Sequence, residues 1–176
     1  MQKNPANATL ARPAIALRYQ AIVSAPVFAL GIRASEDEIL AIDYLPPQAE
    51  QAPGNALAAE AVRQINAYLT DPAFAFGLPL QPQGTAFQRR VRAAITDIPC
   101  GVVRTYGQVA QTIHSGPRAV GGACGANPYP LVVPCHRVVS AGGLGGFGGV
   151  GGNGATVSFL LDVKRWLLAH EGLAIR

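Results

Sequence analysis

The sequence predicts a mixed α/β protein in two parts: a small strand–helix unit, then a helical unit with a helix-turn-helix arrangement. Short apolar runs rich in Ile and Val come first, and amphipathic helical patterns follow. Between them, residues 71–84 contain three prolines and two glycines, as a linker would. The net charge changes sign there too. Residues 1–84 carry five basic and seven acidic side chains, a net charge of −2, whereas residues 85–176 carry nine basic and three acidic side chains, a net charge of +6. We therefore expect one domain at 1–84 and another at 85–176.

Length and composition indicate a folded protein that is not exported. The 176 residues are 49% hydrophobic and 14% charged, which suffices for a core and excludes a disordered chain. No apolar run is long enough to span a bilayer, and arginines and a proline interrupt any signal-peptide core near the N-terminus. Three widely spaced cysteines favour free thiols in a reducing compartment. We expect a cytoplasmic protein without membrane association.

The first part contains three predicted strands and one helix. "YQAIVSA", "VFALGIRA" and "EILAIDYL" are short and β-branched, with turns around Pro26 and residues 35–37, so we expect antiparallel strands. "ALAAEAVRQINAYL" has apolar residues at helical spacing. We interpret Glu36, Glu38 and Asp43 as exposed turn charges rather than metal ligands. This part therefore offers no catalytic group of residues.

Two capping boxes mark helices in the second part. Thr85 with Gln88 precedes one apolar stripe, and Thr105 with Gln108 precedes another. Pro117 then suits the first position of a third helix. Three short helices with tight turns are typical of a helix-turn-helix arrangement. A partner with many negative charges, such as nucleic acid, would suit the basic charge of this part.

The third predicted helix, "GPRAVGGACGAN", is made almost entirely of small residues. Arg118 is its only long polar side chain, so it offers little with which to read base edges. It either packs tightly against another element or lies in a minor groove without reading sequence. The spacing favours packing but leaves both interpretations open.

The glycine-rich segment at 142–154 leads to the last predicted helix, "TVSFLLDVKRWLLAHEG". Its GLGGFG run formally matches a dinucleotide-binding fingerprint, but no strand–turn–helix unit surrounds it and no acidic ribose ligand follows. We interpret it as a loop. Apolar residues of the last helix, including Trp166, are expected to face inward, and Gly172 to cap its end.

"LVVPCHRVV" places Cys135 and His136 within what is otherwise a buried-strand pattern. A cysteine in such a run is usually an inert core residue. Pro134 breaks the strand before the thiol, however, and a bent backbone would present both side chains on one side. Glu171, one of three acids in this part, could orient the imidazole. A Cys–His–acid set activates a thiol as a nucleophile.

The segment from Thr85 to Gly172 resembles the O6-alkylguanine-DNA alkyltransferases, also called methylated-DNA–protein-cysteine methyltransferases. The resemblance rests on "RAVGGACGANPYPLVVPCHRVV" and "KRWLLAHEG", of which PCHRV is the most specific part. It implies a ribonuclease-H-like first domain and a winged or helix-turn-helix-like DNA-binding motif in the second. It also implies single-turnover transfer of an alkyl group from guanine O6, and possibly thymine O4, in duplex DNA. No cofactor or metal would be needed, and the protein would be a monomer without DNA.

The resemblance also implies roles for individual residues. Cys135 would accept the alkyl group, with His136, through a water, and Glu171 forming the thiolate. Tyr106 would protonate the departing guanine and crowd a phosphate, and Arg118 would fill the stack of the flipped nucleotide. The remaining implied site residues brace the turn, hold the base or contact DNA: Asn127, Val138, Phe147, Gly148, Ala119, Gly122 and Ala123.

The sequence departs from the family's pattern at the pocket rim. Phe147 stands where a tyrosine is common, the turn between Tyr106 and Arg118 is about two residues shorter than in many members, and some nine or ten extra residues follow Phe147. Two rival functions remain: a non-catalytic sensor of alkylguanine, and a thiol protease or acyltransferase. The thiol argues against the first, and the basic helix-turn-helix setting argues against the second.

Overall fold

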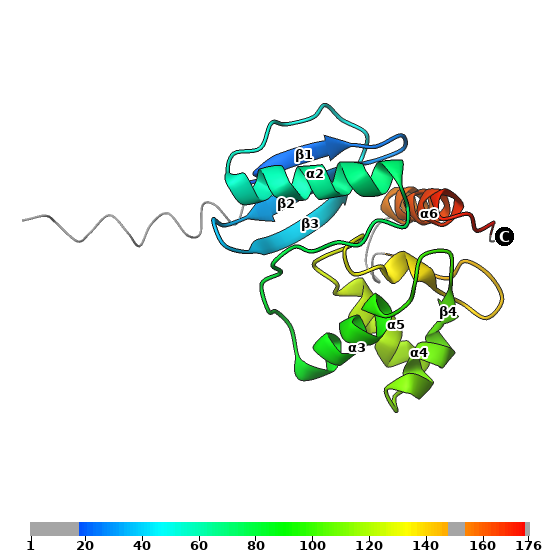
Figure 1. Cartoon of the computed structure of the whole chain (residues 1–176). Helices are drawn as coiled ribbons and strands as arrows, with labels where there is room; N and C mark the ends of the chain where they lie inside the picture. The colour runs from blue at the N-terminus through cyan, green and yellow to red at the C-terminus, as the bar shows by residue number, and fades with distance from the viewer. Residues whose placement is uncertain (1–17, 148–153, 175–176) are drawn as a thin grey trace, which may run out of the picture.

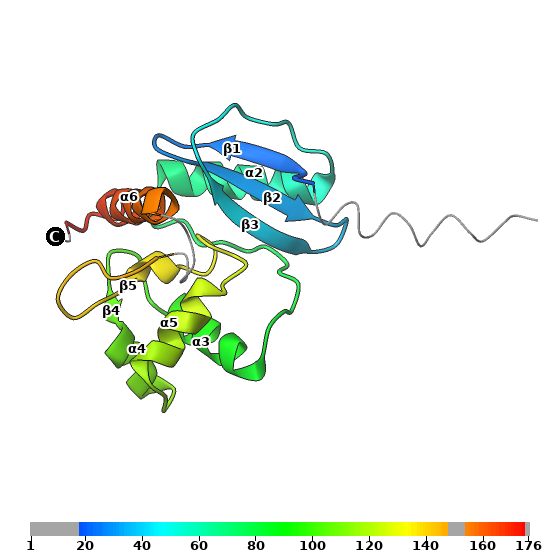
Figure 2. The same cartoon turned by 180° about the vertical axis from the view of Figure 1, so that it is seen from behind.

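The computed structural model describes residues 18–147 and 154–174. It places a sheet and a long helix on one side and a group of short helices on the other, with the last helix at their junction (Figures 1 and 2). The elements in chain order are β1 (Ala21–Ser24), β2 (Ala29–Ala34), β3 (Ile39–Leu45), α2 (Ala56–Thr70), α3 (Ala86–Thr96), β4 (Arg104–Thr105), α4 (Tyr106–Thr112), α5 (Pro117–Gly125), the 3₁₀ helix η2 (Cys135–Arg137), β5 (Val138–Val139) and α6 (Gly154–His170).

The three strands expected in the first part are confirmed and form one antiparallel sheet in the order β1-β2-β3. Helix α2 covers one face of this sheet (Figure 1). It begins at Asn55, whose side chain accepts a hydrogen bond from the backbone N–H of Ala58 at 2.7 Å. On the central strand, the Tyr19 ring lies 2.5 Å from where a Cβ on Gly31 would sit, so any other residue there would displace the ring. The sheet and α2 thus form a compact layer pair.

The helical part begins at the two expected capping boxes. Thr85 with Gln88 caps α3, and Thr105 with Gln108 caps α4, each with both reciprocal hydrogen bonds. Pro117 is the first residue of α5, as expected. Helix α5 packs against both α3 and α4. The predicted helix-turn-helix arrangement is therefore present as a packed unit.

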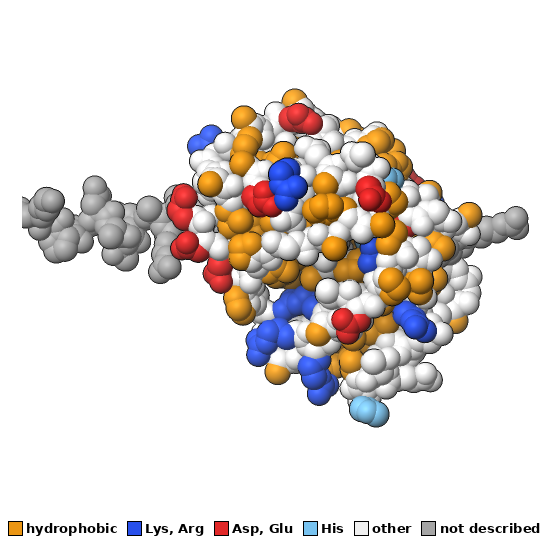
Figure 3. Space-filling model, in the orientation of Figure 1, with side chains coloured by type: hydrophobic (Ala, Val, Ile, Leu, Met, Phe, Trp, Pro, Cys, Tyr) orange, Lys and Arg blue, Asp and Glu red, His pale blue; other side chains and the backbone are white. Residues whose placement is uncertain are grey.

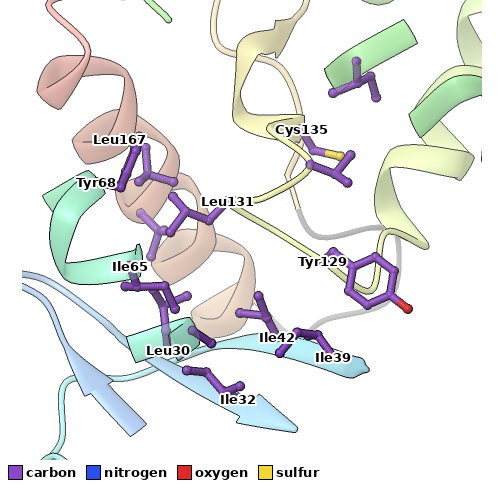
Figure 4. Packing of buried hydrophobic residues seen from close by; sticks show 14 of the residues in the cluster. Leu30, Ile32, Ile39, Ile42, Ile65, Tyr68, Tyr129, Leu131, Cys135 and Leu167 are labelled. Carbon is purple, nitrogen blue, oxygen red and sulfur yellow. The ribbon is translucent and has the colours of Figure 1, made fainter. Parts of the chain in front are cut away.

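Helix α6 joins the two parts through its packing. The Trp166 ring lies 5.4 Å from the ring of Phe28, which directly precedes β2, and the His170 ring lies 5.3 Å from that of Tyr68 in α2, both between ring centroids. Buried residues of both parts form one cluster, as seen around Ile42, Leu131 and Leu167 in Figure 4. The expected division into domains 1–84 and 85–176 stays a proposal, because their hydrophobic core is continuous.

Charge is distributed unevenly over the surface. On the face in Figure 3, acidic side chains lie mostly over the sheet part, and several Lys and Arg side chains lie over the helical part. This distribution follows the change of charge sign along the sequence. In the parts of the chain that are described, no helix combines the length and apolar character needed to cross a membrane.

The prediction of a buried strand over residues 131–139 is wrong for most of that segment. Residues before Pro134 form turns, Cys135–Arg137 form the single-turn helix η2, and only β5 is extended, pairing in parallel with β4. The aliphatic run is buried, as expected, but burial comes from packing of the turns against α6 and the helices rather than from a sheet. The predicted bend at Pro134 is confirmed, because the backbone turns there into η2.

Candidate active site

An open pocket of about 580 Å³ lies between α5, the turn that carries Cys135 and the segment before the last helix. Its lining includes Tyr106, Arg118, Cys124, Cys135 and Phe147. Four of these five residues were expected at the site from the sequence. The pocket therefore gathers side chains that lie up to 41 positions apart in the chain.

Cys135 is the first residue of η2 and is 5% exposed. Asn127 holds it in place, because its side-chain amide donates to the Cys135 Sγ at 3.1 Å and to the Val133 carbonyl at 3.0 Å. The Asn127 side-chain oxygen accepts from the Tyr129 N–H at 3.1 Å. Within this turn Leu131 has a φ of 75°, a conformation that costs a bulky residue energy. Asn127 thus braces a strained turn that presents the thiol.

His136 lies behind the thiol and is completely buried. Its Nε2 is 2.7 Å from the Glu171 Oε1, while its Nδ1 is a buried nitrogen without a hydrogen-bond partner among the described residues. Burial lowers the pKa of His136, and the hydrogen bond with Glu171 opposes this effect. The imidazole is therefore neutral at pH 7 and able to accept a proton.

Glu171 is a buried carboxylate with several donors. Besides His136, it accepts from the Arg137 guanidinium at 3.0 Å and from the Tyr68 hydroxyl of α2 at 2.8 Å. Burial alone would raise the pKa of Glu171, but the hydrogen bonds from His136 and Arg137 outweigh it and lower the pKa to about 2. Glu171 is thus ionised at all pH values at which the protein would work.

The resting form of Cys135 is the thiol. A hydrogen bond with Cys124 and burial both raise the pKa of Cys135 well above its ordinary value, whereas Asn127 and Lys164 lower it by less. Ionisation must therefore accompany a reaction, with the proton passing to a nearby base. His136 is the neutral buried base nearest in sequence, so the arrangement suits a thiol activated only when a substrate is present.

Two further polar groups meet at the pocket rim. The Tyr106 hydroxyl donates to the Gly146 carbonyl at 3.0 Å, and burial raises its pKa to about 12. Lys164 is fully buried, and its Nζ donates to the carbonyls of Val138 at 2.7 Å and Gly146 at 2.9 Å. Burial lowers the pKa of Lys164 to about 8. Lys164 therefore ties β5 to the glycine-rich segment beside the thiol.

The residues expected to contact DNA differ in exposure. Arg118, Ala119 and Gly122 are exposed on α5, whereas Ala123 is 3% exposed and faces the core. A role for Ala123 would therefore be confined to packing beneath the contact surface. Phe147 lines the pocket and packs on Tyr44 at 5.5 Å. Gly148, expected at the base pocket, lies outside the described residues.

Sequence reasoning missed four residues of this site: Tyr68, Cys124, Arg137 and Lys164. A lysine among the apolar inward positions of the last helix was a detectable signal, because a buried lysine needs acceptors. Arg137 adjoins His136 in the sequence and could have been paired with the scarce acid Glu171. Tyr68 gave no such signal, since its contact with Glu171 spans 103 positions.

The fold and the site together define a class: a protein with a helix-turn-helix unit that carries a buried cysteine beside a buried His–Glu pair at the face of that unit. Comparisons with known proteins agree. The family model for the DNA-binding domain of 6-O-methylguanine DNA methyltransferase matches residues 86–173. The chain belongs to this family.

Individual relatives match over different lengths. The regulatory protein ada of Salmonella typhimurium is 45% identical over 112 residues, which is 62% of this chain but 32% of that protein, so the chain spans about a third of it. A methylated-DNA–protein-cysteine methyltransferase of Methanosarcina barkeri is 32% identical over 87% of this chain and 96% of its own length.

Solved structures share the whole architecture. The O6-methylguanine methyltransferase of Mycobacterium tuberculosis has a TM-score of 0.70 at 32% identity, covering 88% of this chain and 92% of that one. A structure of Mycobacterium tuberculosis OGT in complex with DNA has a TM-score of 0.67 at 33% identity, covering 85% and 90% of the two chains. The mixed α/β fold with an N-terminal sheet and a helical second part is therefore that of this family.

Proposed function

We propose that this chain repairs alkylated DNA by transferring an alkyl group from O6 of guanine to the Sγ of Cys135. The observation that carries the proposal is the placement of Cys135 in an open pocket beside α5, with the buried His136–Glu171 pair behind it. In one in-line step the S–C bond forms as the C–O bond breaks. The thioether product is not hydrolysed under cellular conditions, so each molecule acts once.

In this proposal the proton of Cys135 moves to the unpartnered Nδ1 of His136 through a water. The neutral imidazole can accept it, and Glu171 at 2.7 Å from Nε2 stabilises the imidazolium that results. Arg137 keeps Glu171 ionised and oriented. The charge created by the thiolate is thus matched within one buried network.

Tyr106 would donate a proton to the ring nitrogen of the departing guanine. Its pKa of about 12 keeps the phenol protonated at neutral pH, as a donor needs to be. It lies at the first position of α4 and also faces the pocket, so it could crowd the adjacent phosphate and favour flipping. Phe147 and backbone groups near Val138 and Gly148 would hold the base.

We propose that α5 enters the minor groove of duplex DNA. Its exposed small residues allow the backbone to come close without reading sequence, which suits repair in any context. Flipping a nucleotide costs a few kcal/mol, and Arg118 at the pocket edge would fill the resulting gap. The DNA complex of the M. tuberculosis protein and the +6 charge of residues 85–176 support this interface. We expect a monomer before DNA binding and a cytoplasmic location, where the thiol stays reduced.

The test is mass spectrometry after incubation with duplex DNA that carries one O6-methylguanine. We expect one methyl group on Cys135 per lesion and no turnover, with fragment ions separating Cys135 from Cys124 on their common tryptic peptide. The variant Cys135→Ser should bind the same DNA without gaining mass. Binding by the native protein with no change of mass would replace alkyl transfer with a sensor function.

A further inference from the structure

The pocket contains a second thiol that the proposed alkyl transfer does not use. Cys124 lies on α5 and lines the pocket together with Cys135. Each thiol shifts the pKa of the other, so the two side chains lie close together although their residues are eleven positions apart in different elements. Both thiols are free. A pair of facing thiols in an open pocket is a chemical unit distinct from a single nucleophile.

Asn127 fixes this pair from both sides. Its backbone N–H donates to the Cys124 carbonyl at 3.1 Å, while its side chain donates to the Cys135 Sγ at 3.1 Å. The C-terminal end of α5 and the turn that carries Cys135 are thereby held together by one residue.

The surroundings make Cys124 the more reactive thiol towards oxidants. It is partly exposed, whereas Cys135 is 5% exposed. The hydrogen bond from Cys135 and the charge of Lys164 lower the pKa of Cys124, and burial opposes them. Cys124 therefore carries more thiolate at neutral pH than its buried neighbour.

We infer that Cys124 and Cys135 form a redox-active dithiol, which a hydroperoxide converts to an internal disulfide and a thiol reductant restores. The Cys124 thiolate attacks one peroxide oxygen: an S–O bond forms, the O–O bond breaks, and the other oxygen leaves as alkoxide or hydroxide, which takes up the proton that Cys124 released on ionising. Cys135 then attacks the Cys124 sulfur, so that an S–S bond forms and the S–O bond breaks. The hydroxide that leaves takes the Cys135 proton as water.

This chemistry keeps both sulfurs at a stage of oxidation that can be reversed. A lone thiol that has reached the sulfenic state can continue to sulfinic acid, which thiol reductants do not reverse. Formation of the disulfide stops the oxidation of Cys124 at a stage that thiol reductants can reverse. The consequence for repair rests on the proposed function: an oxidised molecule could not accept an alkyl group until it is reduced.

The experiment needs no DNA, so its outcome is independent of alkyl transfer. Reduced protein is freed of reductant, treated with hydrogen peroxide, blocked with iodoacetamide and digested with trypsin. Residues 119–137 form one tryptic peptide that contains both cysteines, and Cys100 lies on another. We expect the first peptide to lose two hydrogen atoms and resist alkylation, to regain both thiols in dithiothreitol, and Cys100 to be alkylated throughout.

The matched variant is Cys124→Ser. There we expect Cys135 to keep its free thiol under the same treatment and to take iodoacetamide once the protein is unfolded, because it is buried and the Cys124 thiolate that reacts first with peroxide is absent. Cys100→Ser should behave as the native protein does. The inference is overturned if native Cys135 gains oxygens while Cys124 still takes iodoacetamide, if neither thiol reacts with peroxide, or if Cys135 loses its free thiol in the Cys124→Ser variant as fast as in the native protein.

Discussion

Asn127 organises three groups around the thiol with a single amide. Its contacts with Cys135, Val133 and Tyr129 satisfy polar groups in a turn where Leu131 has a left-handed backbone. The turn is buried, so water cannot easily replace these bonds. The position of the thiol therefore depends on one side chain more than on the apolar residues around it.

The variant Asn127→Ala tests this dependence. It leaves the Tyr129 N–H without its acceptor and removes one of two donors from the Val133 carbonyl, which also accepts from the Cys135 N–H, so we expect the free energy of unfolding to fall by about 2 kcal/mol. We expect methyl transfer to slow as well, because the turn no longer holds the thiol in the pocket. Urea unfolding and timed mass spectrometry measure the two effects. Asn66→Ala, on the exposed face of α2, is the control and should leave both unchanged.

At the scale of elements, Gly122 of α5 is a position where the needs of folding and of DNA binding differ. Gly122 is exposed, and a Cβ placed there would meet no atom within 4 Å. Nothing within the fold therefore requires glycine at this position. A close approach of the helix backbone to DNA would require it.

Gly122→Ala should accordingly have opposite effects on the two properties. We expect the free energy of unfolding to rise by up to about 1 kcal/mol, because alanine has the higher helix propensity. We expect affinity for duplex DNA to fall severalfold, measured by fluorescence anisotropy at fixed salt. Gly154→Ala in α6, another open helix position, should leave DNA affinity unchanged. Equal DNA affinity for the native protein and the Gly122 variant would contradict the placement of α5 in the groove.

Elements defined by local interactions could be predicted, and contacts between distant segments could not. Both capping boxes are confirmed because each is complete within four residues. The buried-strand expectation around Cys135 was wrong because aliphatic composition records burial but not the geometry of a turn. His136 and Glu171 were proposed from the residues themselves as partners of Cys135, whereas the role of Arg118 came from the family resemblance. The Tyr68 contact and the burial of Lys164 depend on how α2 and α6 pack, which periodicity does not encode.

At the scale of the whole molecule, the ionised Glu171 of the candidate active site makes the free energy of unfolding depend on pH in the acid range. Its pKa is about 2 in the folded protein and has an ordinary value of 4.5, so the folded state binds its proton more weakly. This stability is present above pH 4.5 and is lost as the pH falls towards 2, and amounts to about 3 kcal/mol. We expect Glu171→Gln to remove this part of the acid destabilisation, measured by urea unfolding at pH 7 and pH 3. Glu60→Gln, in an exposed ion pair, should retain it.

Tyr68→Phe tests the contribution of the first part of the chain. Removing its hydroxyl deprives Glu171 of a donor at 2.8 Å and should lower the free energy of unfolding by about 2 kcal/mol. Glu171 then attracts the imidazolium more strongly, so the pKa of His136 rises. We therefore expect the acid limb of methyl transfer to move to higher pH. Tyr19→Phe, whose hydroxyl contacts Asp43 instead, should leave that midpoint in place.

The hydrogen bond from Tyr68 also couples the position of the sheet-and-α2 layer to the proton affinity of Glu171. A ligand that bound this layer and shifted α2 would change the proton affinity of Glu171, and through it the readiness of the thiol to ionise. Such coupling is reciprocal: alkylation of Cys135 would alter the affinity of that ligand by the same factor by which the ligand alters the energetics of the thiol. A protein that acts once could in this way report from a distant surface that its single reaction has taken place.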